Sequence, residues 1–187
     1  MREMLDAVPG KYGSSLMRED EIDALVGLLN STLIVSSFLE VGTYEGVTAS
    51  LIAERCTNST IVSIDPFIDH DDKDPRQRSG AERLANWRKN QRPNQFLWVG
   101  DLASFYALSP RFFDVVLVDG AHHFEGVLAD LEIASLLTSP RGIIAAHDYR
   151  DPAWTEVTRA IEQFVQSTSW RIVRHVESLA ILQEASR

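Results

Sequence analysis

Acidic residues stand at or near the ends of several short apolar segments of the sequence, where they could bind a ligand. These acids are Glu40, Asp65, Asp101, Asp119 and Asp148. A carboxylate near the end of a buried strand must be solvated or paired, so an acid after every strand has no evident structural purpose. In an open parallel sheet, ligands bind outside the carboxyl ends of the strands. The pattern therefore predicts a ligand site at that edge of a sheet.

The first candidate strand-to-helix turn reads Glu40-Val41-Gly42-Thr43-Tyr44-Glu45-Gly46. It differs from the dinucleotide fingerprint G-x-G-x-x-G because a glutamate stands at the first glycine position. A pyrophosphate is bound by backbone N–H groups without a nearby anion, whereas a carboxylate suits a ligand with an ammonium or sulfonium group. Gly42 would let the ligand approach the backbone, and Gly46 would let the helix pack near the strand. A plain tight turn explains the same residues.

Two further acids extend this candidate site. Asp65 ends the second apolar segment, about twenty residues further on, where a carboxylate can accept hydrogen bonds from both hydroxyls of a ribose. Asp65 could also simply end a strand before Pro66. Asp101 could accept a hydrogen bond from an adenine amino group, or it could cap the helix that follows. Together with the first turn, these acids indicate a nucleoside ligand with a cationic tail.

The elements that must position these residues follow from the alternation of short apolar runs with amphipathic stretches. This alternation predicts strands covered by helices on both faces. Parallel strands are expected over residues 38–42, 60–65, 95–99, 113–119 and 143–147, and a hairpin over 170–176 and 179–182. Helices are expected over residues 22–29, 47–55, 81–89, 102–108 and 127–137, with a turn at 139–142 and a last helix beginning at Asp151-Pro152. The fold class is therefore α/β, a Rossmann-like, doubly wound and mostly parallel sheet with an antiparallel C-terminal hairpin.

Composition limits the class of protein and its partners. The chain has 187 residues, of which 44% are hydrophobic and 24% are charged, which is typical of a globular protein. We expect one domain over residues 1–187, no membrane span, no secretion signal and a cytoplasmic location. The single Cys56 excludes an internal disulfide. A net charge of −9 argues against a nucleic-acid partner, so we expect a small-molecule substrate, and a homodimer stays open.

Two segments of the chain differ in character from the rest. Residues 1–37 are predicted to be an N-terminal helical segment. Residues 66–94 form a charged insertion, in which several aspartates precede six basic residues between Arg76 and Arg92. The insertion is either a solvated loop that leads into a charged helix, or a flap over the ligand site.

The sequence resembles a known enzyme family at several of these segments. Residues 38–46, 61–65, 99–101 and 113–119 resemble the class I S-adenosylmethionine-dependent methyltransferases. The stretch VDGAHHFEGVLADL at 118–131, followed by AHDY at 146–149, resembles more narrowly the small-molecule O-methyltransferases grouped with macrocin, rhamnosyl and cephalosporin-tailoring enzymes. The resemblance implies a seven-stranded sheet and an S-adenosylmethionine cofactor. This chain departs from that branch at Ala121, where an acid is frequent, and in a short segment before Phe38.

The resemblance also implies site residues. The candidate cofactor-binding residues are Glu40, Gly42, Thr43, Tyr44, Gly46, Asp65, Asp101 and Asp119. Members of the branch often hold a divalent metal after the fourth and fifth strands, and the matching positions here are Asp119, His147 and Asp148. Neighbouring strands lie about 4.8 Å apart, so residues at their ends can share an ion. A histidine ligand leaves magnesium, manganese, iron and zinc open; alternatively, no metal binds and His147 is a packed histidine.

The expected reaction is methyl transfer from S-adenosylmethionine to an oxygen of a small molecule, assisted by the metal where one is bound. His122 is the candidate base for the hydroxyl proton, with Asp119 as its catalytic neighbour, and the adjacent His123 is the alternative base. Two other functions stay open. The chain could be a non-catalytic scaffold that binds the cofactor, or a nicotinamide oxidoreductase that uses Asp65 without the glycine pattern.

Overall fold

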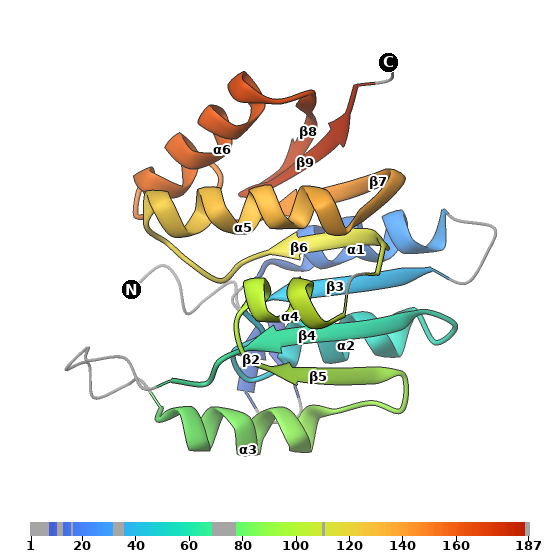
Figure 1. Ribbon diagram of the computed structural model, residues 1–187. Helices are drawn as coiled ribbons and strands as arrows, with labels where there is room; N and C mark the ends of the chain where they lie inside the picture. Colours follow the sequence, from blue (N-terminus) through green and yellow to red (C-terminus); the bar gives the residue numbers. More distant parts are fainter. Residues whose placement is uncertain are drawn as a thin grey trace.

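Seven strands form one mixed sheet in the order β5-β4-β3-β6-β7-β9-β8 (Figure 1). The computed structural model describes residues 8–10, 13–15, 17–31, 36–68, 78–109 and 111–185. The strands of the sheet are β3 (Ser37–Val41), β4 (Thr60–Asp65), β5 (Gln95–Val99), β6 (Phe113–Val118), β7 (Thr138–Ala146), β8 (Trp170–Val176) and β9 (Leu179–Glu184). Strands β3 to β7 pair in parallel, whereas β9 is antiparallel to both β7 and β8. The predicted doubly wound sheet with its antiparallel C-terminal hairpin is confirmed.

Helices cover both faces of this sheet. They are α1 (Glu19–Asn30), α2 (Val47–Arg55), α3 (Gly80–Asn90), α4 (Leu102–Leu108), α5 (Phe124–Leu137) and α6 (Thr155–Ser167), and a separate small hairpin joins β1 (Val8–Gly10) to β2 (Gly13–Ser15). Figure 1 shows α4, α5 and α6 on the near face and α1 and α2 on the far face. Among the helices that the structure describes, none is long and apolar enough to cross a membrane.

The core has two layers because successive strand residues point to opposite faces of the sheet. In β6, Val116 and Val118 pack in the cluster that includes α4, α5 and α6, whereas Val115 and Leu117 pack in the cluster that includes α1 and α2. The almost continuous apolar run of β6 follows from this burial on both faces. Cys56 is buried in the second cluster.

The strand order reverses beside β3, which places the candidate site. Strand β3 pairs with β4 on one side and with β6 on the other, although β6 lies much later in the chain. The register sets Val41 opposite both Ile64 and Val118. The turns that follow these three strands therefore open at one point of the sheet edge, which is where open α/β sheets bind ligands.

Two predicted boundaries were wrong. The last helix begins at Thr155 and not at Asp151-Pro152. Asp151 instead caps a turn, because its Oδ1 accepts a hydrogen bond from the backbone N of Ala153 at 2.8 Å. Residues 139–142 belong to β7 rather than to a separate turn, but the strand is irregular there: Arg141 has a φ of 68°, and the pairing with β6 shifts register between Phe113 and Val115.

The two segments singled out in the sequence are described in part. Within residues 1–37 the structure describes α1 and also the β1-β2 hairpin, so the expected helical segment includes strands. Within the charged insertion, α3 confirms the expected helix and begins at a capping box, in which the side chains of Ser79 and Glu82 each bond the other residue's backbone N–H. The alternative prediction, that the insertion over residues 66–94 is a flap, stays a prediction, and residues 69–77 of it lie outside the described residues.

Candidate active site

The turn after β3 contacts the turn after β6 through Gly42. Gly42 has a φ of +88°, and a Cβ atom there would overlap with the backbone of Asp119 and Gly120. The backbone N of Gly42 donates to Ile64 O at 2.9 Å, and that of Asp119 donates to Val41 O at 3.0 Å. Only glycine allows this close approach, so the first turn of the predicted cofactor site shares a wall with Asp119.

Glu40 is a buried carboxylate below this turn. Glu40 is 2% exposed, and its Oε2 accepts a hydrogen bond from Ser63 Oγ at 3.0 Å. Burial raises the pKa of Glu40 to about 7, and the carboxylates of Asp119 and Asp65 act in the same direction. Within the described part of the chain, no basic side chain forms an ion pair with Glu40. A cationic ligand group nearby would stabilise its ionised form.

Asp65 supports the same turn from β4. Its Oδ2 accepts a hydrogen bond from the backbone N of Tyr44 at 2.9 Å, and its Oδ1 accepts one from the backbone N of Phe67 at 2.7 Å. The guanidinium of Arg83, on α3, lies 3.7 Å from Oδ1 and also stands over the ring of Tyr44. Asp65 is thus held at the turn by backbone and charge, at the position predicted for a ribose-binding acid.

Asp101 is an exposed helix cap. It is the N-cap of α4, and its Oδ1 accepts a hydrogen bond from the backbone N of Ser104 at 2.7 Å. This hydrogen bond lowers the pKa of Asp101. The capping role that the sequence allowed is therefore present, and the contact with adenine stays a prediction.

Helix α3 packs against the predicted cofactor turn, which consists of residues 42–46 after β3, through side chains that the sequence pattern did not assign to the site. Glu45 is buried and contacts both the Arg78 guanidinium and Asn86 Nδ2, the latter at 3.2 Å. Asn90 Nδ2 donates to the backbone O of Glu45 at 2.9 Å, and the Trp87 ring lies against Gly46. Positions 86, 87 and 90, together with 83, lie on one side of a helix because three- and four-residue spacings share a face. The sequence spacing thus indicates one shared face of α3, but it does not show that this face contacts Glu45 and Gly46.

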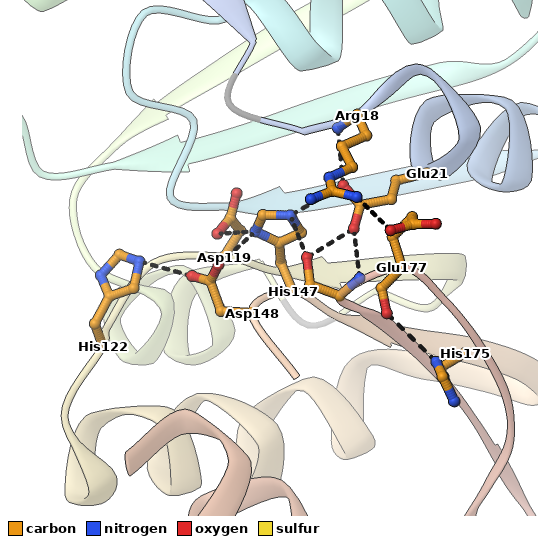
Figure 2. A network of polar contacts seen from close by, with 9 residues as sticks. Arg18, Glu21, Asp119, His122, His147, Asp148, His175 and Glu177 are labelled. Atoms are coloured by element: carbon orange, nitrogen blue, oxygen red, sulfur yellow. Dashed lines mark hydrogen bonds and ion pairs between the residues drawn. The ribbon is translucent and has the colours of Figure 1, made fainter. Parts of the chain in front are cut away.

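The turn after β6 and the turn after β7 bring together an acid–histidine cluster, which consists of Asp119, His122 and Asp148 (Figure 2). One ligand atom from each residue lies within 4.8 Å of the others. His122 Nε2 lies 3.1 Å from Asp148 Oδ2, and this hydrogen bond raises the pKa of His122. Asp148 has a φ of 60°, a left-handed backbone conformation that is costly for a residue other than glycine.

His147 lies beside this cluster and is 8% exposed. Its Nδ1 lies 3.2 Å from Asp119 Oδ1 and 3.3 Å from Asp148 Oδ1, and its Nε2 lies 3.2 Å from Glu21 Oε2 (Figure 2). Burial lowers the pKa of His147, but the three carboxylates outweigh this effect and raise it well above its usual value. The predicted metal residues Asp119, His147 and Asp148 are thus adjacent, and the structure adds His122 on the opposite side of Asp148.

Two further residues border the cluster. The Trp154 ring lies against the ring of His122, with 4.3 Å between the ring centroids and 35° between the planes. Trp154 is partly exposed, so it can limit the movement of His122 and still contact a substrate. His123 is exposed at the N-cap of α5, so of the two adjacent histidines it is His122 that contacts Asp148.

The donor set fits a divalent cation. The carboxylates of Asp119 and Asp148, from adjacent strand ends, are oxygen ligands that can hold a divalent ion such as magnesium or manganese. Asp119 and Asp148 each direct one oxygen toward His147, and the second oxygen of Asp148 contacts His122. Asp119 Oδ2 has no hydrogen bond or ion pair among the described residues.

Residues 39–149 match the family model described as Methyltransferase domain, Methyltransf_24. The O-methyltransferase NovP is similar in structure, with a TM-score of 0.66 and 13% identity over 92% of this chain and 82% of that one. The O-methyltransferase from Bacillus cereus in complex with SAH has a TM-score of 0.62 and 14% identity over 91% of this chain and 82% of that one. These two similarities show the fold.

A curated relative in sequence is an uncharacterized protein of Acanthamoeba polyphaga mimivirus, 21% identical over 130 residues. The match covers 69% of this chain and 59% of that protein, so this chain spans less than two-thirds of its relative. The family model, in contrast, covers more than half of this chain. The chain therefore belongs to the methyltransferase domain family, which confirms the resemblance to class I S-adenosylmethionine-dependent methyltransferases.

Proposed function

We propose that this chain transfers the methyl group of S-adenosylmethionine to a hydroxyl oxygen of a small-molecule acceptor, with a divalent ion at Asp119 and Asp148. The observation that carries the proposal is the contact between Gly42 and the backbone of Asp119 and Gly120. It makes the cofactor turn and the acid–histidine cluster two sides of one site. A sulfonium methyl bound at the cofactor turn and a hydroxyl bound at the acid–histidine cluster can be aligned for in-line methyl transfer.

The cofactor side is supported by charge. Glu40 has a raised pKa and no basic partner among the described residues, so it suits the ammonium and sulfonium groups of S-adenosylmethionine. Asp65 is the candidate for the ribose hydroxyls and Asp101 for the adenine amino group. Thr43, Tyr44 and Gly46 complete the turn that would surround the ligand.

The acceptor side is supported by the arrangement of His122. With Nε2 assigned as the donor to Asp148, Nδ1 is free to accept the hydroxyl proton, as in other acid-oriented histidine bases. Trp154 restrains the ring from its face. A divalent ion on Asp119 and Asp148 would orient the hydroxyl and lower its pKa. His122 then takes the proton while the oxygen attacks the methyl carbon and the C–S bond breaks.

The experiment is a methyl-transfer assay with S-adenosylmethionine and a panel of phenols, catechols and sugars, each with excess chelator and with added manganese or magnesium. Formation of S-adenosylhomocysteine together with an O-methylated product, faster with metal, supports the proposal. Full turnover in chelator would remove the metal and leave His122 alone as the proton acceptor. Binding of S-adenosylhomocysteine without turnover on any acceptor would favour a non-catalytic scaffold, and binding of NAD instead would favour an oxidoreductase.

A further inference from the structure

A buried carboxylate from the N-terminal helix contacts His147, which lies beside the acid–histidine cluster. Glu21, in the first turn of α1, lies next to His147 (Figure 2), and its exposed fraction is 0%. Its Oε2 lies 3.2 Å from His147 Nε2 and accepts a hydrogen bond from the backbone N of Arg18 at 2.8 Å. Its Oε1 accepts hydrogen bonds from Ser178, from the backbone N at 2.9 Å and from Oγ at 2.7 Å. Both oxygens of Glu21 are therefore fixed in position.

The partners of Glu21 exceed what a helix cap needs. A capping box requires one bond from the glutamate to the N-cap backbone, which Arg18 supplies. The bonds to Ser178 tie α1 to the turn between β8 and β9, and the contact with His147 leads to the end of β7. Burying a charged carboxylate is costly unless it is paired and hydrogen-bonded, and here Arg18, Ser178 and His147 together supply the partners of Glu21.

The surroundings of His147 determine what its ring can do. Its Nε2 faces Glu21, and its Nδ1 faces one oxygen of Asp119 and one of Asp148. Because carboxylates accept hydrogen bonds, both ring nitrogens are assigned as donors. In this position the ring can hold the two carboxylates, which would otherwise repel each other and turn apart.

We infer that Glu21 is a positioning residue for the methyl-transfer site. Glu21 keeps His147 in place as a double donor, and His147 fixes the carboxylates of Asp119 and Asp148 in the orientation that binds the ion. Partners behind the ligands of a metal commonly orient those ligands in this way. This role rests on the proposed function, because the ion at Asp119 and Asp148 belongs to it, and it adds that α1 contributes to the site.

The test measures Mn²⁺ binding to the full chain through the electron paramagnetic resonance of free Mn²⁺, and S-adenosylhomocysteine binding by calorimetry. Glu21→Gln keeps the shape and removes the charge, and we expect Mn²⁺ to bind about tenfold more weakly. We expect the affinity for S-adenosylhomocysteine to stay within about twofold, since Glu21 contacts His147 and not the cofactor turn. Asp20→Asn is the matched control, because Asp20 is exposed in the same helical turn and carries the same charge. Equal Mn²⁺ affinity in wild type and Glu21→Gln would overturn the inference.

A second arm separates this inference from the proposed function. If the wild type binds S-adenosylhomocysteine but no Mn²⁺, the ion in the proposed function is wrong, and the coupling of Glu21 to the cluster is then read from urea unfolding. Glu21→Gln, Asp148→Asn and the double variant should shift the unfolding midpoint non-additively, because both side chains act on His147. Additive shifts would overturn the positioning role.

Discussion

At the scale of single residues, the proposed cofactor site is built around a buried carboxylate, Glu40, which forms no ion pair with a basic side chain among the described residues. Glu40 is buried with a pKa of about 7, against an ordinary 4.5. A ligand that brings an ammonium and a sulfonium group favours the ionised form, so it must displace a proton from Glu40 below pH 7. Ligand affinity and proton release are therefore linked at this residue.

We predict that S-adenosylmethionine binds more tightly as the pH rises from 6 to 8. Below pH 7 its affinity should fall by up to about tenfold per pH unit, because the protonated fraction of Glu40 grows. Calorimetry at several pH values measures this dependence. Glu40→Gln should weaken binding and flatten the profile. An affinity in the wild type that does not change with pH would contradict the role given to Glu40.

The same substitution supplies a control for folding. Because the pKa of Glu40 is higher in the folded state, its contribution to stability is full at low pH and is lost as the pH rises from 4.5 through 7. Glu40→Gln should therefore raise the free energy of unfolding of the ligand-free chain at pH 8, by about 3 kcal/mol at most. If Glu40→Gln binds the ligand more weakly although its free energy of unfolding is higher, the loss of binding is not caused by a loss of stability.

Asp148 should act on the metal and not on the cofactor. Asp148→Asn keeps the shape of the side chain and removes its charge, so we expect Mn²⁺ to bind at least about tenfold more weakly. The affinity for S-adenosylhomocysteine should stay nearly unchanged, because Asp148 contacts His122 and His147 rather than the turn after β3. Titrations of both ligands check this. A matching loss of both affinities would place Asp148 in the cofactor site instead.

At the scale of elements, the contact between the turns after β3 and β6 is the feature that a single substitution can disrupt most directly. Gly42→Ala puts a Cβ atom into the backbone of Asp119 and Gly120 at a positive φ. Left-handed backbone alone costs alanine about 1–2 kcal/mol, and the overlap adds to it. We predict a lower melting temperature and loss of S-adenosylhomocysteine binding, measured by thermal unfolding with and without ligand.

Gly27→Ala is the matched control for that variant. Gly27 lies inside α1, and a Cβ atom there meets nothing within 4 Å. Alanine should stabilise this helix by up to about 1 kcal/mol. If Gly42→Ala behaved like Gly27→Ala, the two turns would not be in the contact described here.

Much of the fold could be predicted from the sequence because local patterns determine it. The apolar runs at 60–65 and 113–118 predicted buried strands, and the spacing in 127–137 predicted the face of α5. Boundaries were less certain where one pattern serves two structures. Asp151-Pro152 is typical of a helix start but also of a tight turn, and the turn was formed.

The acids at the strand ends could be predicted for a similar reason, since parallel strands bring their carboxyl ends to one edge. The side chains that contact those acids could not be predicted from the sequence. Glu21 lies far from His147 in the sequence, and its polar role is hidden in the apolar face of α1. The contact of Glu45 with Asn86 likewise depends on how α3 packs, which the sequence pattern of either segment alone does not contain.

At the scale of the whole molecule, the topology joins the cofactor turn and the cluster to one rigid sheet. A ligand that binds only the folded state stabilises the entire chain, by roughly 2.7 kcal/mol at one hundred times its dissociation constant. For a chain of this size the melting temperature should rise by about 5 to 10 °C with S-adenosylhomocysteine. Asp65→Ala should remove most of that rise. A shift with NAD and none with S-adenosylhomocysteine would contradict the cofactor assignment.

The central claim is that the cofactor and a divalent ion bind next to each other, at the point where the turns after β3, β6 and β7 converge. Anomalous diffraction from crystals grown with S-adenosylhomocysteine and Mn²⁺ tests this claim most directly. We predict one manganese peak bound by the carboxylates of Asp119 and Asp148, with the sulfur of the cofactor beside it and His147 hydrogen-bonded behind the two acids. A bound cofactor with no manganese at this edge, or manganese bound through His147, would contradict the account.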